Sequence, residues 1–239
     1  MSKIGIIAQA HMGSTRLRNK MLKDLYGRSV IGCVITRLRQ VKNADALIVA
    51  ISDEPEDDIL VQELETYGVD YYRGSNSDVL SRFYCAAQKY KLTDIVRVCS
   101  DNTLIDFRIL EDEINFYKGG KHEVVTSGSH IPLGLGGEIF PLALLQKAYE
   151  NASEPYQHEH VTPYIYEHCT DVYRYDIEQD YSKYRFTLDT EDDWKLIRNI
   201  YRELHAKVAN FTLSDVIDIM KSNPEWYNLN SAVRQKPVK

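Results

Sequence analysis

The chain has 239 residues, of which 44% are hydrophobic, and a formal net charge of -6 from 29 basic and 35 acidic residues. This length and apolar content suffice for one large α/β domain, and an acidic chain without a basic stripe argues against nucleic acid as a partner. No apolar run approaches the ~20 residues that span a bilayer, no secretory signal is recognisable, and the four cysteines lack C-x-x-C spacing, so we expect a cytoplasmic protein without a membrane partner.

The first half alternates short apolar runs with longer segments whose apolar residues recur at helical spacing. Strands are predicted at 3–10, 46–51, 69–72, 94–99 and 123–126, and helices at 30–38, 55–67, 78–89 and 106–117. In the helix 55–67, we expect Ile59, Leu60, Leu64 and Tyr67 to face the core. Strands separated by helices of this length predict βαβ units and a mainly parallel sheet.

The second half has a different pattern, beginning with a glycine-rich stretch at 131–137 that has no helical period. Helices are predicted at 141–151, 159–168, 190–205 and 213–222, and strands at 171–176 and 185–188. The last dozen residues are expected to form a loose tail. The simplest organisation is one domain, 1–239, with an insertion in the middle of the chain.

The loop that follows the first predicted strand, 9–20, combines a glycine, two hydroxyls and three cations. These residues are Gly13, Ser14, Thr15, Arg16, Arg18 and Lys20. Ligands bind at the carboxyl ends of the strands in an open α/β sheet, where backbone N–H groups and cations can hold phosphate oxygens. The loop therefore predicts phosphate binding, with a solvated basic loop as the alternative. It matches neither the Walker A pattern nor G-x-G-x-x-G, which argues against a dinucleotide site.

Two aspartates follow the predicted strand 94–99, and they suit different roles. Asp101 lies just past the strand end, where a carboxylate can hold Mg²⁺ together with substrate phosphates, with the capping of a turn as the alternative. Asp106 directly precedes a helix and is expected to be its N-cap. Further along, Asp189 ends the predicted strand 185–188, whereas the acidic residues 191–193 suit the start of the next helix.

The first loop carries a family resemblance. Its pattern, Ala-x-Met-Gly-Ser-Thr-Arg-Leu-x-x-Lys followed by Gly27, resembles the signature loop of cytidylyltransferases that make CMP-activated sugar acids. It is most similar to the spore-coat-polysaccharide (SpsF-type) branch, which is related to the CMP-Kdo and CMP-sialic acid synthetases. The chain departs from that pattern at His11, where the family has arginine, and at Arg18 and Asn19, where it has Pro-Gly.

The resemblance implies a three-layer, nucleotide-diphospho-sugar-transferase-like (Rossmann-like) domain and a Mg²⁺-dependent transfer of CMP from CTP, with release of pyrophosphate. Segments 100–106 and 188–192 resemble the family's two metal-binding motifs, and 74–82 resembles its nucleotide-contacting segment. The implied catalytic residues are Arg16, Lys20 and Asp101, and the implied metal ligands are Asp101 and Asp189. The implied nucleotide contacts are Ala10, His11, Gly13, Ser14, Thr15, Asp78 and Arg82. Without the resemblance, Asp78 suits a helix N-cap and Arg82 a surface cation.

The segment 157–164 contains two histidines, His158 and His160, that are two positions apart and diverge on a helix. This spacing argues against a zinc protease, and the segment resembles Glu-His-Val-Thr-Pro-Tyr of the SpsF-type branch. We expect it to line an acceptor pocket, with a satisfied histidine at a helix start as the alternative. Relatives dimerise through an inserted arm, so the resemblance also implies a homodimer with an arm near 128–140.

The acceptor is left open between two chemistries. The resemblance implies a small anionic acceptor, either a sugar acid for a cell-surface glycan or capsule, or a phosphorylated molecule such as phosphoglutamine. Two other classes remain: a glycosyltransferase using a nucleotide-sugar, which predicts an Asp-x-Asp that this chain lacks, and a non-catalytic nucleotide-binding subunit.

Overall fold

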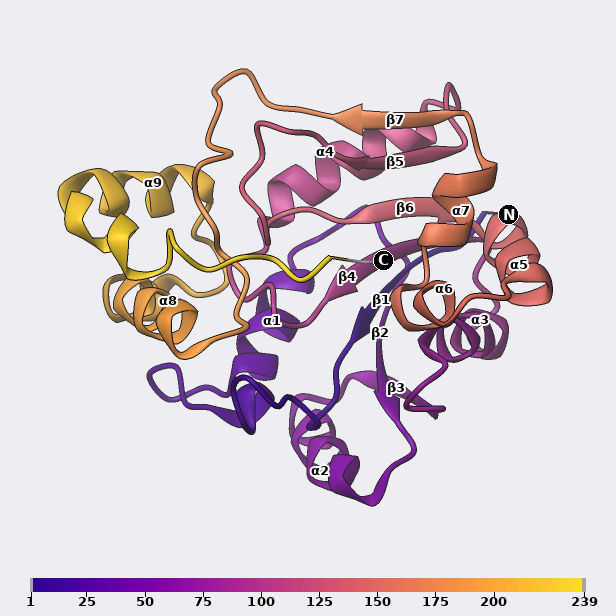
Figure 1. The fold of residues 1–239 in the computed structure, drawn as a ribbon, viewed down its shortest axis with the longest axis horizontal. Coiled ribbons are helices and arrows are strands. Elements are labelled where there is room, and N and C mark those ends of the chain that lie inside the picture. Colours follow the sequence, from indigo (N-terminus) through magenta and orange to yellow (C-terminus); the bar gives the residue numbers. More distant parts are fainter. Residues whose placement is uncertain (1, 238–239) are drawn as a thin grey trace.

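The computed structural model describes residues 2–237, whose strands form a seven-stranded sheet in the order β3-β2-β1-β4-β6-β5-β7 (Figure 1). The strands are β1 Ile4–Gln9, β2 Ala46–Ser52, β3 Asp70–Gly74, β4 Asp94–Cys99, β5 Val124–Ser127, β6 Glu138–Pro141 and β7 Val172–Tyr175. Strands β1 to β4 pair in parallel, β6 runs antiparallel to both β4 and β5, and β7 is parallel to β5. The prediction of an α/β fold with a mainly parallel sheet is confirmed.

Helices cover both faces of this sheet. They are α1 Val30–Leu38, α2 Asp58–Tyr67, α3 Val79–Lys89, α4 Phe107–Lys118, α5 Leu142–Asn151, α6 Pro155–His160, α7 Pro163–His168, α8 Glu191–Leu204 and α9 Leu213–Ser222. Short 3-10 turns lie at η1 Lys20–Leu22, η2 Pro55–Asp57, η3 His205–Lys207 and η4 Pro224–Leu229. Within residues 2–237, no helix has the length and apolar character that crossing a membrane requires.

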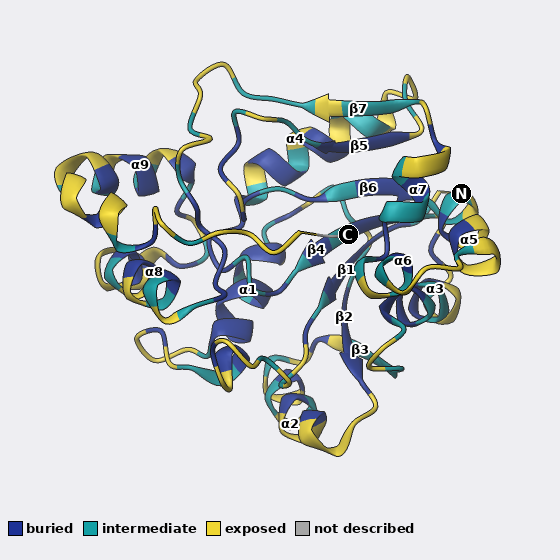
Figure 2. Cartoon of the chain, in the orientation of Figure 1, coloured by how far each residue is buried: buried dark blue, intermediate teal, exposed yellow. Residues whose placement is uncertain are grey.

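The alternation of side chains along β1 explains the three layers. Ile4 and Ile6 face a cluster that includes residues of α1 and α4, whereas Ile7 faces the cluster of α3 and α5 on the other side. Both sets are buried, so the strand reads as a continuous apolar run, as expected for a central parallel strand. Figure 2 shows the same arrangement, with buried strands in the middle and exposed surface on the outer helices.

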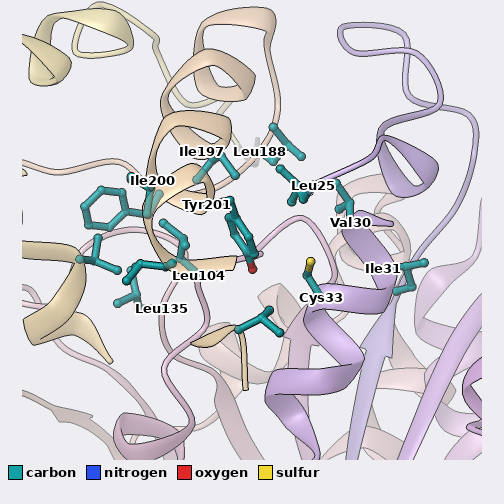
Figure 3. Close-up of a cluster of buried hydrophobic side chains, with 14 of the residues drawn as sticks. Leu25, Val30, Ile31, Cys33, Leu104, Leu135, Leu188, Ile197, Ile200 and Tyr201 are labelled. Atoms are coloured by element: carbon teal, nitrogen blue, oxygen red, sulfur yellow. The ribbon is translucent and has the colours of Figure 1, made fainter. Parts of the chain in front are cut away.

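The largest core cluster lies beneath one end of the sheet and joins segments that are far apart in sequence. Figure 3 shows Leu25, Leu104 and Leu188 packed around Tyr201 of α8. Leu25 lies shortly after the loop 9–20, Leu104 lies shortly after Asp101, and Leu188 directly precedes Asp189. Because the cluster is fully buried, its packing fixes those three segments relative to one another.

Two predicted elements have a different form in the structure. The predicted helix 159–168 is split between α6 and α7, because Val161 has a left-handed φ of 70° and Pro163 begins a new helix. The predicted strand 185–188 is an extended segment outside the sheet. Its backbone N–H groups bond to loop carbonyls instead, Phe186 N to Leu133 O and Leu188 N to Asp101 O.

Two smaller expectations are also corrected. Ile59 was expected in the core but its side chain faces solvent, with 49% of the residue exposed, while Leu60 and Leu64 carry the buried face of α2. The expected loose tail begins with η4, and Asn230 within it is only 4% exposed. Its amide bonds to Arg185 and Asp193, which tether this segment to the end of the sheet where α8 begins.

Candidate active site

Four charged side chains from three separate segments meet at the carboxyl end of the central strands. Lys20 Nζ lies 3.0 Å from Asp101 Oδ2 and 3.3 Å from Asp189 Oδ1, and Arg16 Nη2 lies 3.0 Å from the same Asp189 oxygen. Arg16 and Lys20 come from the loop after β1, Asp101 follows β4, and Asp189 precedes α8. The structure thus brings together the residues that were predicted to be catalytic or metal-binding.

Lys20 lies at the centre of this cluster and is 6% exposed. Its ammonium group also donates a 3.0 Å hydrogen bond to the carbonyl of Leu188. Burial alone would lower the pKa of Lys20, but the charges of Asp101 and Asp189 outweigh burial and raise the pKa. Lys20 is therefore fully protonated at neutral pH, and its three donors point at oxygen atoms.

The donor set at this cluster suits a hard cation. Residues 2–237 contain no group of three or more His, Cys, Asp or Glu side chains arranged to hold a metal. Asp101 and Asp189, however, are both within hydrogen-bond distance of one ammonium, so their oxygens converge on a common point. Two converging carboxylates are what Mg²⁺ uses when substrate phosphates supply further ligands.

The loop after β1 is tied to the end of β2 by Asp57, a residue that the sequence analysis did not single out. One Asp57 oxygen accepts a 2.7 Å bond from Met12 N, and the other accepts bonds from the backbone and hydroxyl of Ser52. Asp57 is 1% exposed, so this anchor is shielded from water. It holds the loop across the strand ends, where Gly13 and Thr15 are exposed and Ser14 is half-buried.

Beside the loop lies a pocket of about 650 Å³. Its lining includes His11 from the loop, Asp78 and Arg82 from the start of α3, and His158 and His160 from α6. Arg82 is 3% exposed, and its Nε and Nη1 atoms are buried without a hydrogen-bond partner among residues 2–237. Buried unpaired donors are costly, so this guanidinium indicates a ligand that accepts hydrogen bonds.

Asp78 and His158 contact each other at the rim of this pocket. Asp78 caps α3, because its Oδ1 accepts a 2.9 Å bond from Ser81 N, and the same oxygen lies 3.1 Å from His158 Nδ1.

Partial desolvation by the pocket wall, together with the charges of Lys20 and Arg82, lowers the pKa of His11. His11 is therefore a neutral hydrogen-bonding group at pH 7 and adds no charge to the phosphate loop.

Two further pockets continue along the strand ends, with volumes of about 280 and 410 Å³. Both are lined by Arg97 of β4 and Glu138 of β6, which form an ion pair. The smaller pocket is closed by the segment 131–137, and the larger one includes His160 and Thr162. The smaller pocket is also lined by Cys99 and Asn102, which places it close to the predicted metal ligand Asp101.

A buried carboxyl supports the glycine-rich segment from behind. Glu113 of α4 is fully buried, and its oxygens accept bonds from Ser127 Oγ (2.6 Å) and Gly137 N (3.1 Å). Burial raises the pKa of Glu113 to about 8, so the side chain is mostly neutral at pH 7. A Cβ at Gly137 would lie 2.8 Å from Leu110 Cδ1 and 3.1 Å from the carbonyl oxygen of Arg97, so any larger residue here would displace its neighbours.

The raised pKa of Glu113 predicts that stability falls as pH rises. The folded chain keeps this proton up to about pH 8 while the unfolded chain loses it near its ordinary pKa, so wild-type stability decreases across that window. Glu113→Gln cannot ionise, and its free energy of unfolding should gain roughly 2–4 kcal/mol relative to wild type between about pH 5 and pH 8. Urea unfolding at several pH values measures this, with the exposed Glu65→Gln as control; parallel pH profiles for wild type and Glu113→Gln would contradict the prediction.

Three further residues that were singled out in the sequence lie at the ends of strands and helices. Ala10 is buried and its N–H bonds to Ala50, so only its carbonyl can face a ligand. Asp106 is the N-cap of α4, as predicted, with its Oδ1 accepting a 2.8 Å bond from Arg108 N. Asp193 belongs to the capping box of α8, as the acidic helix start suggested, but it is also fully buried against Arg185.

Comparison with known proteins gives consistent results along the whole chain. A family model described as Cytidylyltransferase matches residues 4–215. The chain is 38% identical to the uncharacterized protein MJ1063 of Methanocaldococcus jannaschii over 240 residues, which cover 99% of this chain and 97% of that protein. It is 32% identical to the spore coat polysaccharide biosynthesis protein SpsF of Bacillus subtilis, over 94% of this chain and 97% of SpsF.

A solved structure has the same fold over nearly the full length. The cytidylyltransferase of Leptospira borgpetersenii serovar Hardjo-bovis matches with a TM-score of 0.87 and 31% sequence identity. The match covers 99% of this chain and 100% of that one. The shared fold therefore spans the segments that carry Arg16, Lys20, Asp101 and Asp189 in this chain.

Proposed function

Because this chain belongs to the cytidylyltransferase family and is thus a nucleotidyltransferase, we propose that it transfers CMP from CTP to a small acceptor and releases pyrophosphate. The observation that carries this proposal is the cluster of Arg16, Lys20, Asp101 and Asp189. Two cations suit the triphosphate, and two carboxylates suit a divalent cation. Their position at the strand ends is where open α/β sheets bind ligands.

Arg16 and Lys20 are assigned to the triphosphate. Both now contact Asp189, and phosphate oxygens of CTP would replace that carboxylate as their partners. Gly13, Ser14 and Thr15 add backbone and hydroxyl donors from the same loop. Asp101 and Asp189 would hold Mg²⁺, which would supply positive charge next to the phosphates and lower the repulsion that an incoming nucleophile meets.

The pocket of about 650 Å³ is assigned to the base and ribose of CTP. The unpaired Nε and Nη1 atoms of Arg82 support this assignment, because they are buried donors aimed at a site that needs hydrogen-bond acceptors. Cytosine offers such acceptors on its ring edge. His11 and Asp78 line this pocket, and Ala10 joins it to β1 at the start of the phosphate loop.

We assign the acceptor to the two pockets that share Arg97 and Glu138. Arg97 supports an acceptor carrying a carboxylate or phosphate, but Glu138 already neutralises part of its charge. Neutral polar residues, Asn102 and Thr126, line the smaller pocket beside that ion pair, which favours a polyhydroxylated sugar acid over a compact phosphate ester. By analogy with SpsF, the product would serve cell-surface polysaccharide synthesis.

The chemistry requires positioning more than covalent participation. An acceptor oxygen attacks the α-phosphorus in line and pyrophosphate leaves on the opposite side, so one P–O bond forms as another breaks. Arg16 and Lys20 stabilise the charge that collects on the leaving pyrophosphate. Asp101 lies between the phosphate loop and the acceptor pockets, which suits a residue that orients both reactants.

We also propose a homodimer that uses the segment near 128–140 of a single-domain chain. Leu133 in this segment is 47% exposed, while Ile131 and Leu135 on either side are buried in the chain's own core. An exposed leucine held on a fixed loop suits a contact with a second copy.

The proposed function predicts pyrophosphate release that depends on CTP, Mg²⁺ and an acceptor together. The assay compares CTP with UTP and dTTP, using a panel of sugar acids and phosphorylated acceptors. We expect CTP to be preferred by at least tenfold in kcat/KM, or about 1.4 kcal/mol, because the buried donors of Arg82 recognise one base edge. Equal rates with the three nucleotides would contradict the choice of CTP, and release only with phosphorylated acceptors would replace the sugar acid.

A further inference from the structure

Arg185 joins the proposed metal ligand Asp189 to Asp193 in the first turn of α8 and to Gln235 near the end of the chain. Its Nη2 donates a 2.8 Å bond to Asp189 Oδ2, and its Nε lies 3.0 Å from Asp193 Oδ1. Its Nη1 donates a 2.6 Å bond to Gln235 Oε1. Arg185 is 9% exposed, so most of this ion-pair network is shielded from solvent.

The two oxygens of Asp189 have different partners. Oδ2 is bound by Arg185, whereas Oδ1 is the oxygen that contacts Arg16 and Lys20. Phosphates can draw Arg16 and Lys20 away from Asp189, because both belong to the phosphate loop. Arg185 cannot follow, since Asp193 and the chain end hold its other nitrogens. The carboxylate is therefore anchored through Oδ2, and Oδ1 is presented to the nucleotide.

Asp193 fixes Arg185 in turn. It is fully buried and accepts bonds from the backbone N–H groups of Asp189 and Thr190, which close the first turn of α8. Asn230 donates a 2.9 Å bond to Asp193 Oδ1 and another of 2.9 Å to the carbonyl of Arg185. Every charged group of the network thus has a partner, which makes a single arrangement favourable.

The C-terminal segment reaches this network from the far side of α9. In Figure 1 the yellow segment that follows α9 runs back past α8 toward the middle of the view. The contacts of Asn230 and Gln235 establish that the segment reaches the start of α8. Helix packing alone does not explain these bonds, since Gln235 is exposed and lies beyond η4.

We propose that Arg185, held by Asp193 and by Asn230 and Gln235 of the C-terminal segment, is a positioning residue that sets which oxygen of Asp189 faces the nucleotide. This inference rests on the proposed function, because it takes Asp189 as a metal ligand. Groups that orient a metal ligand without touching the metal alter metal affinity by about 10–100-fold when they are replaced.

The experiment compares wild type with Arg185→Lys and Gln235→Leu in the full chain. Mn²⁺ replaces Mg²⁺ as the probe, and its binding to the protein–CTP complex is followed by electron paramagnetic resonance. Arg185→Lys keeps the charge but cannot bridge the two carboxylates, so we expect Mn²⁺ affinity to fall by about 10–100-fold, with a smaller change in the KM for CTP. Gln235→Leu removes only the contact between Arg185 and the chain end, so its Mn²⁺ affinity should also fall, but by a smaller factor.

Mn²⁺ affinity, CTP binding and the position of the Asp189 carboxylate together separate positioning from a purely structural role and from failure of the proposed function. Arg202→Lys, on the exposed side of α8, is the matched control and should bind Mn²⁺ like wild type. Unchanged Mn²⁺ affinity in a folded Arg185→Lys protein would overturn the positioning role and leave the proposed function intact. If wild type binds no CTP, the proposed function fails. The role of Arg185 is then tested by crystal structures of ligand-free wild type and Arg185→Lys. An Asp189 carboxylate that has not moved in Arg185→Lys would overturn the inference.

Discussion

Asp101→Asn should reduce turnover by at least about 10³-fold, which corresponds to about 4 kcal/mol of transition-state stabilisation. The amide keeps the size of the side chain but loses the negative charge that faces Lys20 at 3.0 Å. A neutral amide is a poor Mg²⁺ ligand and no longer balances the ammonium beside it. The measurement is kcat for pyrophosphate release at saturating CTP and Mg²⁺.

The loss should come from chemistry and not from unfolding. The Asp101 side chain is 24% exposed, and Lys20 keeps its contacts with Asp189 and the Leu188 carbonyl in the variant. Thermal unfolding should therefore change little. Asp70→Asn is the control, because Asp70 is exposed at the start of β3, at the opposite edge of the sheet from the cluster. Turnover near the wild-type value in Asp101→Asn would remove Asp101 from the metal site.

The phosphate loop and Asp101 could be predicted because their positions depend on local sequence alone. A short apolar run predicts a buried parallel strand, and whatever follows such a strand lies at the ligand-binding edge of the sheet. Lys20 and Asp101 each follow a strand of this kind, so their proximity followed from topology. The antiparallel β6 could not be predicted in the same way, because its four residues follow a glycine-rich segment without a periodic pattern.

The residues that support the site gave weaker signals. Asp57 lies in the 3-10 turn before α2, where an acidic residue is ordinary, and its contact with Met12 depends on how the loop folds back. Arg185 lies in a segment that resembles a strand, and two of its partners, Asn230 and Gln235, are about 45 to 50 residues away in sequence. Glu113 did have a signal, since it lies three and four residues after Leu110 and Ile109 on the buried face of α4.

Lys20→Met should lower kcat/KM for CTP by about 10²–10³-fold and raise the KM for CTP. Methionine fills a similar volume in the buried site, so the change isolates the ammonium from its packing. Without the ammonium, Asp101 and Asp189 face the triphosphate with only Arg16 and Arg185 to balance them, and the anionic nucleotide meets net repulsion. Steady-state kinetics with varied CTP measures both constants, and Lys23→Met, with its ammonium over Trp194, is the control.

The pH dependence of the wild type provides an independent check on Lys20. The two carboxylates raise the pKa of Lys20 above the ordinary lysine value. Lys20 therefore stays protonated, and keeps its contribution to stability, below the ordinary lysine pKa, and it loses both only as pH rises through the raised pKa. Titration of Lys20 should therefore cause no change in the KM for CTP through neutral and mildly alkaline pH.

If Lys20→Met leaves the KM for CTP unchanged, Lys20 does not bind the triphosphate, and its ammonium serves only to hold Asp101 and Asp189 together.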